Sequence, residues 1–260
     1  MPPHIRPQST VDAGLLLSDA GVLDWQNAQI CGVAVKTVRR WRRLYQRRGV
    51  VRGGTAPMPP CLICDDGPLD VGAYAYLLGL YLGDGHIILN KRGVYVLSIF
   101  QDNHYPGLIE EYRDVIKAVK PGARPHLSPK AGCTAVQAYS KHWFCLFPQH
   151  GAGVKSKRSI VLEPWQREIV ELDPKPFLRG LIFSDGCRIT NRTTRLVRGQ
   201  ARRYEYPRYF FSNRSEDILG LCTWALDLLD IAWRRSNAWH ISVARREAVA
   251  TLDEFVGPKY

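Results

Sequence analysis

The sequence lacks any apolar run near the length of about 20 residues that a membrane-spanning helix needs. Its first residues, Met1-Pro2-Pro3-His4, are polar and do not have the charged and apolar segments of a secretory signal peptide. Acidic residues are also scarce: 24 Asp and Glu stand against 36 Lys and Arg, for a formal net charge of +12 and a pI of about 9.5. We therefore expect neither a membrane-spanning nor a secreted protein, and the basic excess favours a polyanionic partner.

The seven cysteines do not suggest a disulfide framework, because their number is odd and the chain is far longer than a small secreted scaffold. This usage favours a reducing cytosol. A hydrophobic content of 45% over 260 residues is enough for a packed core. The length fits one pseudo-symmetric domain with a small appendage, and we expect a cytoplasmic protein that associates with the nucleoid if its partner is DNA.

One nine-residue stretch occurs twice and organises the chain. Residues 77–85 read Leu-Leu-Gly-Leu-Tyr-Leu-Gly-Asp-Gly, and residues 178–186 read Leu-Arg-Gly-Leu-Ile-Phe-Ser-Asp-Gly. Each copy has the apolar spacing of a helix and ends at an acid, Asp84 in the first and Asp185 in the second. An internal repeat of this kind predicts two related halves.

Small residues leave one stripe of each expected helix without bulk. They lie four positions apart, Gly79 with Gly83 in the first copy and Gly180 with Ser184 in the second. Glycine inside a helix costs about 1 kcal/mol relative to alanine, so two glycines in one short helix need a reason. Close contact between the two helices supplies one. It would bring the two terminal acids together.

Two carboxylates held close together repel each other, and a divalent cation such as Mg²⁺ or Mn²⁺ relieves that repulsion. Two such ions can clamp both sides of an in-line phosphoryl displacement. The metal-site residues expected from this pattern are Asp84, Asp185, Gly83 and Ser184. The alternative is that each Asp-Gly pair only ends its helix, with Gly85 and Gly186 as left-handed caps.

These motifs resemble the LAGLIDADG homing endonucleases, whose name spells the nine-residue helix with its terminal acid and glycine. The matching residues are Leu77, Gly79, Leu80, Asp84 and Gly85, then Leu178, Gly180, Leu181, Asp185 and Gly186. The sequence departs from the family name at the sixth position, where Leu82 and Phe183 stand in place of Asp.

The resemblance implies an α+β fold with two pseudo-symmetric αββαββα repeats, whose saddle-shaped antiparallel sheets lie on double-stranded DNA. It also implies a monomer without a small-molecule cofactor, with the two acids binding the metals at the scissile phosphates.

Residues 1–50 are expected to form a small all-α domain, with a loose arm over residues 1–12 and helices over residues 13–49. Within it, Ala28, Gly32, Val38 and Trp41 have the spacing of a helix-turn-helix. The second helix of this motif docks in the major groove of DNA, and the residues expected to face DNA are Lys36, Thr37, Arg39, Arg40 and Arg43. A solvated cationic helix is the alternative.

A linker is expected over residues 51–71, which are rich in glycine and proline and contain a Cys-x-x-Cys pair at Cys61 and Cys64. Such a pair can be half of a zinc site. The nearby candidates for the other half are Cys133, His142, Cys145 and His150. Packing cysteines, or the relic of a zinc ribbon, are the alternatives.

The two repeats are predicted over residues 72–167 and 168–260. Each is expected to run in the order helix, two strands, helix, two strands, helix. In repeat 1 the predicted strands are 86–89, 95–100, 124–128 and 133–139. In repeat 2 they are 187–191, 205–212, 232–236 and 239–243.

A basic insertion separates the first two strands of repeat 2, over residues 192–208. A hairpin loop dense in arginine suits a DNA groove, and most such residues touch phosphate. The residues expected to contact DNA are Arg192, Arg195, Arg198, Arg202 and Arg203. A loop that is merely soluble is the alternative.

Further catalytic residues are expected at strand ends around the metal-bound water. Gln101 and Asn213 end the second strands of their repeats, while Lys141 and Arg245 follow the fourth strands. The hypothesis is a site-specific endonuclease that cuts both DNA strands by metal-assisted hydrolysis. The rival is a transcription regulator that has kept the fold without cutting. An intein remnant is disfavoured because neither end of the chain carries splicing residues.

Overall fold

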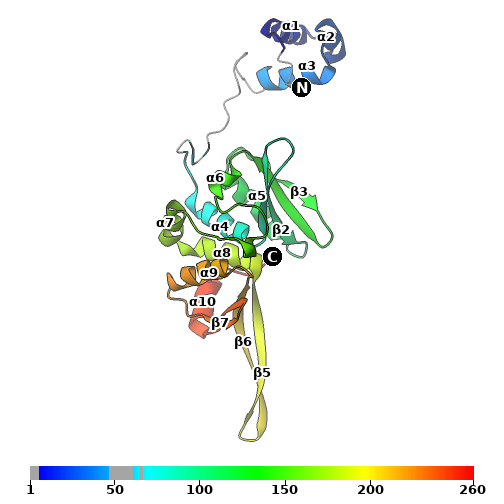
Figure 1. Ribbon diagram of the computed structural model, residues 1–260. Helices are drawn as coiled ribbons and strands as arrows, with labels where there is room; N and C mark the ends of the chain where they lie inside the picture. The colour runs from blue at the N-terminus through cyan, green and yellow to red at the C-terminus, as the bar shows by residue number, and fades with distance from the viewer. Residues whose placement is uncertain (1–5, 47–60, 62, 65–66) are drawn as a thin grey trace. The chain divides into compact units, whose positions relative to one another are not determined.

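The computed structural model describes residues 6–46, 61, 63–64 and 67–260 (Figure 1). The chain divides into two compact units, Met1–Pro59 and Pro60–Tyr260. Most of the expected linker, 51–71, lies outside the described residues. Among the helices described, none combines the length and the apolar character needed to cross a membrane.

The N-terminal unit is all helical. It contains α1 (Gln8–Asp19), α2 (Asp24–Ile30) and α3 (Val35–Trp41), followed by a π-helical turn over Arg42–Gln46. Its core is made by Val11, Leu15, Ala28, Val38 and Trp41.

The turn between α2 and α3 contains Gly32 in the left-handed region, at φ +60°. The predicted register of small and apolar residues is therefore present. The expected loose arm over residues 1–12 is wrong for its last part, because α1 begins at Gln8 and places Val11 in the core.

The second unit repeats one order of elements. Repeat 1 contains α4 (Val71–Leu82), β1 (Gly85–Leu89), β2 (Tyr95–Asp102), α5 (Pro106–Val119), β3 (His126–Pro129), β4 (Cys133–Ser140), α6 (Trp143–Leu146) and the short 3₁₀ turn η2 (Lys155–Lys157). Repeat 2 contains α8 (Pro174–Asp185), β5 (Gly186–Val197), β6 (Gln200–Ser212), α9 (Glu216–Asp227), β7 (Arg234–Asn237), β8 (His240–Val243) and α10 (Arg246–Phe255). The predicted α+β fold with two αββαββα repeats is confirmed.

The two sheets have the same topology. Their strand orders are β1-β2-β4-β3 and β5-β6-β8-β7, with antiparallel pairing throughout the described ladders. The first strand of each sheet follows its motif helix closely, after the two turn residues Gly83 and Asp84 in repeat 1 and directly in repeat 2. Figure 1 shows α4 and α8 side by side between the two sheets. Both helices belong to one continuous apolar core that also includes α5, α9 and α10.

Between the repeats lies α7 (Pro164–Leu172), which was not predicted and which spans the expected boundary at 167/168. Its start is well specified locally. Pro164 occupies the first helical turn, and Glu163 and Gln166 form a reciprocal capping box.

The basic insertion of repeat 2 is a hairpin and not a loop. β5 and β6 pair without interruption from Gly186↔Phe211 to Val197↔Gln200. Arg198 and Gly199 form the turn, with φ of 51° and 78°. Positive φ at both central residues is the geometry of the two-residue turn that suits a twisted hairpin. The expected loop at 192–208 is therefore corrected to two extended strands.

Candidate metal centre and nucleic-acid interface

The two motif helices touch through their glycines. A Cβ atom on Gly79 would overlap the carbonyl oxygen of Phe177 and lie 2.8 Å from the Leu181 nitrogen. In the same way, a Cβ atom on Gly180 would overlap the carbonyl oxygen of Tyr76. Side chains at these positions would force the backbones apart. The predicted close contact of the small-residue stripes is confirmed.

This contact continues to the helix ends and sets the acids beside each other. A Cβ atom on Gly83 would overlap the Ser184 hydroxyl and lie 3.3 Å from Oδ2 of Asp185. Asp84 follows Gly83 directly, at the turn into β1. The carboxylates of Asp84 and Asp185 thus converge where the two repeats meet, one from each helix.

The glycines after the acids do not act as left-handed caps. Neither Gly85 nor Gly186 has positive φ, and each is the first residue of a strand. They are needed for space, because Cβ atoms there would lie 2.5 Å from the Tyr81 Cα and 2.7 Å from the Ile182 Cα. Close packing against the motif helices therefore requires glycine at both positions, in addition to any role in ending the helices.

Burial raises the pKa of both acids. Burial is the main cause for Asp185, the charge of Asp84 adds to it, and the pKa of Asp185 rises to about 6. Burial likewise raises the pKa of Asp84. The Asp84 side chain nevertheless keeps an exposed edge, and Asp185 is half-buried. Both carboxylates are therefore accessible to solvent, which leaves them open to a cation and a phosphate.

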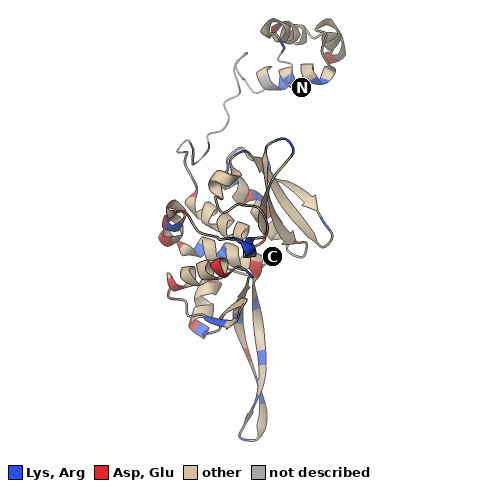
Figure 2. Ribbon diagram, in the orientation of Figure 1, with Lys and Arg blue, Asp and Glu red and all other residues tan. Residues whose placement is uncertain are grey.

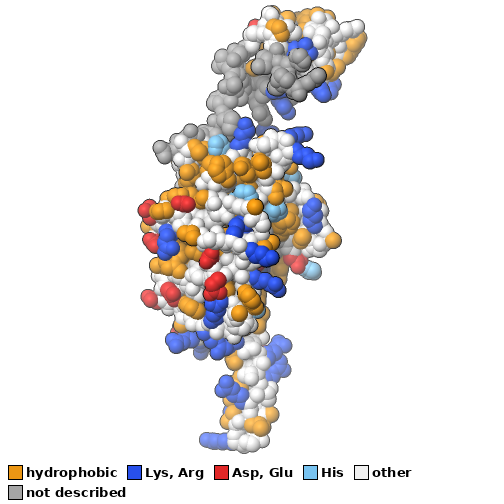
Figure 3. All heavy atoms as spheres, in the orientation of Figure 1, with side chains coloured by type: hydrophobic (Ala, Val, Ile, Leu, Met, Phe, Trp, Pro, Cys, Tyr) orange, Lys and Arg blue, Asp and Glu red, His pale blue; other side chains and the backbone are white. Residues whose placement is uncertain are grey.

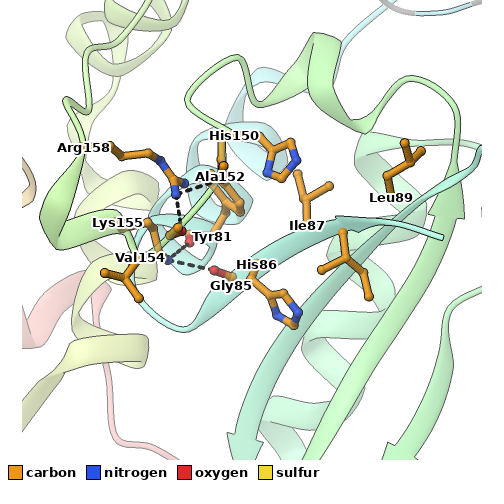
Figure 4. Close-up of a pocket in the computed structure, with 13 residues that line it drawn as sticks. Tyr81, Gly85, His86, Ile87, Leu89, His150, Ala152, Val154, Lys155 and Arg158 are labelled. Atoms are coloured by element: carbon orange, nitrogen blue, oxygen red, sulfur yellow. Dashed lines mark hydrogen bonds between the residues drawn. The ribbon is translucent and has the colours of Figure 1, made fainter.

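Lys155 projects into this centre from the segment after α6. Its ammonium donates to the carbonyl oxygens of Tyr81, Leu82, Gly83 and Gly85 at 2.6 to 2.8 Å, and Figure 4 shows it among the end of α4 and the start of β1. A cation at a helix C-terminus is favourable because the carbonyl dipoles point toward it. Burial lowers the pKa of Lys155 to about 8, although Asp185 and Asp84 oppose that shift.

The groove beside Lys155 is lined by β1 and by the segment 150–158, and its cavity volume is about 740 Å³ (Figure 4). Arg158 keeps this segment in place, because its guanidinium donates to the carbonyl oxygens of Gln149, Gly151 and Gly153.

Lys259 occupies the related place in repeat 2. It donates to the carbonyl oxygen of Gly186 at 2.9 Å, as Lys155 does to that of Gly85. Burial lowers the pKa of Lys259, while Asp84, Cys187 and Asp185 oppose that shift. The two lysines thus lie at equivalent positions of the two repeats, on either side of the paired acids.

Sequence reasoning missed this pair as site residues. A signal was present: Gly153-Val154-Lys155 and Gly257-Pro258-Lys259 share a Gly-x-Lys pattern. Both glycines have positive φ, at 78° and 70°.

The predicted carboxamides occupy equivalent positions in their sheets but have different partners. The motif glycines Gly85 and Gly186 pair with Ile99 and Phe211 in the neighbouring strands. Gln101 and Asn213 each lie two residues after these partners. Asn213 donates from Nδ2 to Oδ2 of Asp185 at 2.6 Å. Gln101 is buried and accepts from the Tyr112 hydroxyl at 2.7 Å. The structure therefore brings Asn213 into direct contact with an acid, whereas Gln101 is bonded to α5.

Four other predicted site residues are placed differently from expectation. Strand direction separates Lys141 from the acids, since β4 pairs Thr134 with Gln101 but Ser140 with Tyr95, about 20 Å away along the strand. Arg245 likewise follows the end of β8 that pairs with Tyr209, away from Asn213.

The proposed metal positions before the acids are already bonded. The carbonyl of Gly83 accepts from Lys155, and the Ser184 hydroxyl donates back to its own helix at the carbonyl oxygens of Gly180 and Leu181.

The long hairpin sorts its arginines onto two faces. Residues paired across the strands share a face, and faces alternate along each strand. Arg195 and Arg202 pair with each other, on the same face as Ile189 and Arg208. Arg192 and Arg203 lie on the opposite face, where both form ion pairs with Glu205. Arg198 lies in the turn. Figure 2 shows basic positions along the whole hairpin, and Figure 3 shows their side chains projecting from it.

The sheet of repeat 1 presents a different surface on its corresponding face. His86 stacks on Phe100 and His126 stacks on Tyr139, with ring centroids 5.5 and 5.4 Å apart. Gln137 lies between them and donates to the Ser98 hydroxyl. These strand residues carry aromatic and hydrogen-bonding groups and not arginines.

In the N-terminal unit, basic residues of α3 and of the π-helical turn after it line a groove of about 440 Å³. Its lining residues are Lys36, Arg39, Arg40, Arg42 and Arg43 together with Asp24. Asp24 accepts from Arg42 at 2.7 Å and from Arg39 at 3.2 Å, so it ties α2 to α3. Arg39 therefore has an intramolecular partner, although 70% of its side chain is exposed. Arg40, Arg43 and Lys36 are exposed, and Thr37 is half-buried.

The fold places the Cys-x-x-Cys pair beside two of the four residues that were candidates for the other half of a zinc site. Cys61 and Cys64 lie beside His142 and Cys145 in repeat 1. Cys133 and His150 are not part of this group.

No family model matches the sequence, and no curated protein matches it either. Solved structures with a similar fold include I-DmoI in complex with DNA and Ca, at 15% identity and a TM-score of 0.44 over 72% of this chain and 91% of that one. Another is the LAGLIDADG meganuclease I-AabMI bound to uncleaved DNA, at 12% identity and a TM-score of 0.46 over 70% and 82%. A third is the N-terminal LAGLIDADG domain of DUF199/WhiA, at 14% identity and a TM-score of 0.42 over 73% and 83%. By its own motifs, their glycine contacts and its two matching sheets, the second unit of this chain has the two-repeat LAGLIDADG architecture.

Proposed function

We propose that this protein binds double-stranded DNA site-specifically and cuts both strands by divalent-metal-dependent hydrolysis. One observation carries the proposal: Asp84 and Asp185 converge at the joint of the two repeats, with Lys155 and Lys259 on either side. Partial burial of two acids side by side raises their pKa values and costs folding free energy, so a purely structural role does not explain the pair.

The donor set fits a hard cation. Each repeat contributes one carboxylate as a ligand. The nearby carbonyls of Gly83, Gly85 and Gly186 are not needed as ligands, because they accept hydrogen bonds from the two lysines. Mg²⁺ characteristically takes one or two carboxylates and completes its shell with water and phosphate oxygens. Asp84 and Asp185 would hold the cation, which lowers the pKa of bound water and neutralises charge on the phosphate.

The protein's own groups would orient this centre. Asn213 fixes one oxygen of Asp185 through its 2.6 Å hydrogen bond. Lys155 and Lys259 would stabilise the negative charge that develops on the phosphate, since their charges lie in a partly desolvated site. Both acids belong to one chain, so a monomer would carry the complete centre.

DNA would lie across the outer faces of the two sheets. The hairpin β5–β6 would reach along a groove with Arg195, Arg202 and Arg208 on one face. Salt dependence of binding should be steep, because each neutralised phosphate releases counterions. The helix-turn-helix unit would add a second reading element through α3, with Lys36, Arg40 and Arg43 facing DNA.

A second candidate function is a regulator that binds DNA without cutting it. The observation that favours it is the difference between the acids: Asn213 supports Asp185, while its counterpart Gln101 is bonded to Tyr112. An N-terminal helix-turn-helix unit also suits regulation.

Cleavage of a plasmid library that carries host-genome or randomised inserts separates the two functions. We expect double-strand breaks at recurrent sites in Mg²⁺ or Mn²⁺, and their loss in EDTA. Recurrent sites recovered by pull-down, without breaks in either metal, would establish the regulator instead.

A further inference from the structure

A second metal-ligating cluster lies away from the paired acids, at the start of the second unit. It consists of Cys61, Cys64, His142 and Cys145, whose ligand atoms all lie within 4.8 Å of one another. Cys64 Sγ is 3.6 Å from Cys145 Sγ and 3.9 Å from His142 Nδ1, and Cys145 Sγ is 3.7 Å from that nitrogen.

These separations are those of a tetrahedral zinc shell. With Zn–S bonds of about 2.3 Å and Zn–N bonds of about 2.0 Å, the sulfur corners lie about 3.8 Å apart and a nitrogen lies about 3.5 Å from each sulfur. We propose that Cys61, Cys64, His142 and Cys145 bind one structural Zn²⁺ ion.

The ligand types and their spacing support zinc over other ions. Three thiolates and an imidazole are soft ligands that suit zinc and would not suit Mg²⁺ or Ca²⁺. Both halves have the short spacing of structural zinc sites, Cys-x-x-Cys in the segment before α4 and His-x-x-Cys at α6. The site is closed, because four protein ligands complete the tetrahedron.

The position of His142 is set independently of any metal. His142 precedes the first residue of α6, and its backbone nitrogen donates to the Ser140 hydroxyl at 3.0 Å. This places its Nδ1 atom and the Cys145 sulfur, three residues later, on the same side of the short helix.

A comparison of the last helices shows what the ion would do. In repeat 2, α10 runs over Arg246–Phe255 and packs three buried residues, and Asp253 accepts from Arg188 and Tyr209. In repeat 1, α6 spans Trp143–Leu146, a single turn. One turn of helix is not stable by itself, and a metal cross-link would hold it.

The segment that follows α6 leads to the paired acids. It continues through residues 147–154 to Lys155, whose ammonium caps α4. The Tyr74 hydroxyl anchors the end of α6 by donating to the Leu146 carbonyl at 2.5 Å. The zinc site would anchor its beginning, so that the ion would fix both the chain entering α4 and the segment carrying Lys155. This inference concerns metal content and does not depend on cutting.

Metal analysis of the full-length protein tests it. The protein is produced in zinc-supplemented medium, purified without chelator, and assayed for zinc by mass spectrometry. We expect about one zinc per chain. Cys64→Ser and Cys145→Ser should each lose most of this zinc, while Cys133→Ser, a cysteine of the same repeat outside the cluster, should retain it.

Cobalt substitution decides the matter even if the serine variants fail to fold. Wild-type protein stripped of metal and refilled with Co²⁺ should show thiolate-to-cobalt charge-transfer bands and tetrahedral d–d bands. Stripping should lower the melting temperature by about 4 °C or more. Asp185→Asn should keep its zinc, which separates this site from the paired acids.

Three results would overturn the proposal. One is wild-type protein without zinc and without cobalt–thiolate bands. Another is zinc that persists in both serine variants. The third is a Cys64–Cys145 disulfide in freshly purified protein, seen by mass spectrometry.

Discussion

Repeat 1 and repeat 2 share most of what lies at their joint and differ chiefly away from it. Both have a motif helix whose glycine touches the other helix, an acid at its end and a Gly-x-Lys segment that returns to the acid. They differ in the length of the first hairpin, in the partner of the equivalent carboxamide and in the last helix.

This difference indicates two separate requirements, one on the residues at the joint and one on the residues away from it. Under the proposed function, groups near the twofold joint would act alike on two antiparallel DNA strands, which accounts for their duplication. Groups farther away would meet different base pairs, which accounts for their differences. β1 has 5 residues, whereas β5 has 12 and extends about 24 Å further.

The largest expected effect concerns the acids. Asp84→Asn and Asp185→Asn should each reduce double-strand cutting by at least about 100-fold, because even outer-shell changes at metal sites cost 10- to 100-fold. Single-turnover cleavage of a supercoiled target measures this. If each acid serves one strand alone, the single variants would produce nicked plasmid, and unequal losses would show that the centre is functionally asymmetric.

The joint itself should be the most sterically sensitive part of the fold. Gly79→Ala and Gly180→Ala should destabilise the second unit by about 2 kcal/mol or more, because the added methyl overlaps the facing backbone. Gly220→Ala in α9 is the matched control: nothing lies within 4 Å of its Cβ position, so it should stabilise by up to about 1 kcal/mol. Chemical denaturation measures both effects. Equal behaviour of the three variants would contradict the close contact of α4 and α8.

The two lysines should differ in effect although they are related by the repeat. Lys155→Met should reduce cutting about 10- to 100-fold, and Lys259→Met should reduce it less, because Lys155 donates to four carbonyls and Lys259 to one. The exposed Lys157→Met is the control and should cut normally. A Lys155→Met variant with full activity would remove this residue from the site.

Measurements of DNA binding can distinguish the roles of the two faces of the β5–β6 hairpin. Arg195→Ala and Arg202→Ala should each weaken DNA binding and lower the slope of log K against log salt by about 1. Arg192→Ala and Arg203→Ala should leave the slope nearly unchanged, because those residues lie on the opposite face and pair with Glu205. Equal effects on both faces would mean that DNA is not bound by one face of the hairpin.

The smallest expected effect is a change in how the free energy of unfolding depends on pH. The folded pKa of Asp185, about 6, exceeds its ordinary value of 3.8, so its ionisation costs stability as the pH rises between these values. Asp185→Asn should therefore be more stable than wild type by about 1–2 kcal/mol above pH 6, and the difference should vanish below about pH 4. Thermal unfolding over this range measures it. The exposed Asp114→Asn should show the opposite sign, because Lys117 lowers the pKa of Asp114.

Elements with strong local signals could be predicted from the sequence. The paired glycines predicted the contact between α4 and α8. The register of Ala28, Gly32, Val38 and Trp41 predicted the N-terminal core. The order of helices and strands along each half followed from recognising the repeat.

What could not be predicted depended on direction and on long-range packing. Lys141 and Arg245 were expected at the acids because they follow strands, but antiparallel pairing carries those strand ends away. Lys155 and Lys259 lie far in sequence from the acids they flank. The Cys-x-x-Cys pair left four candidates open, and packing of α6 against the segment before α4 selected His142 and Cys145.

One measurement tests the central claim most directly: site-selective binding and plasmid cutting by wild type and Asp185→Asn, side by side in Mg²⁺ and Mn²⁺. The paired-acid account predicts that both proteins bind the same site and that wild type alone linearises the plasmid. Cutting that persists in Asp185→Asn, or wild-type binding without cutting in either metal, would contradict it.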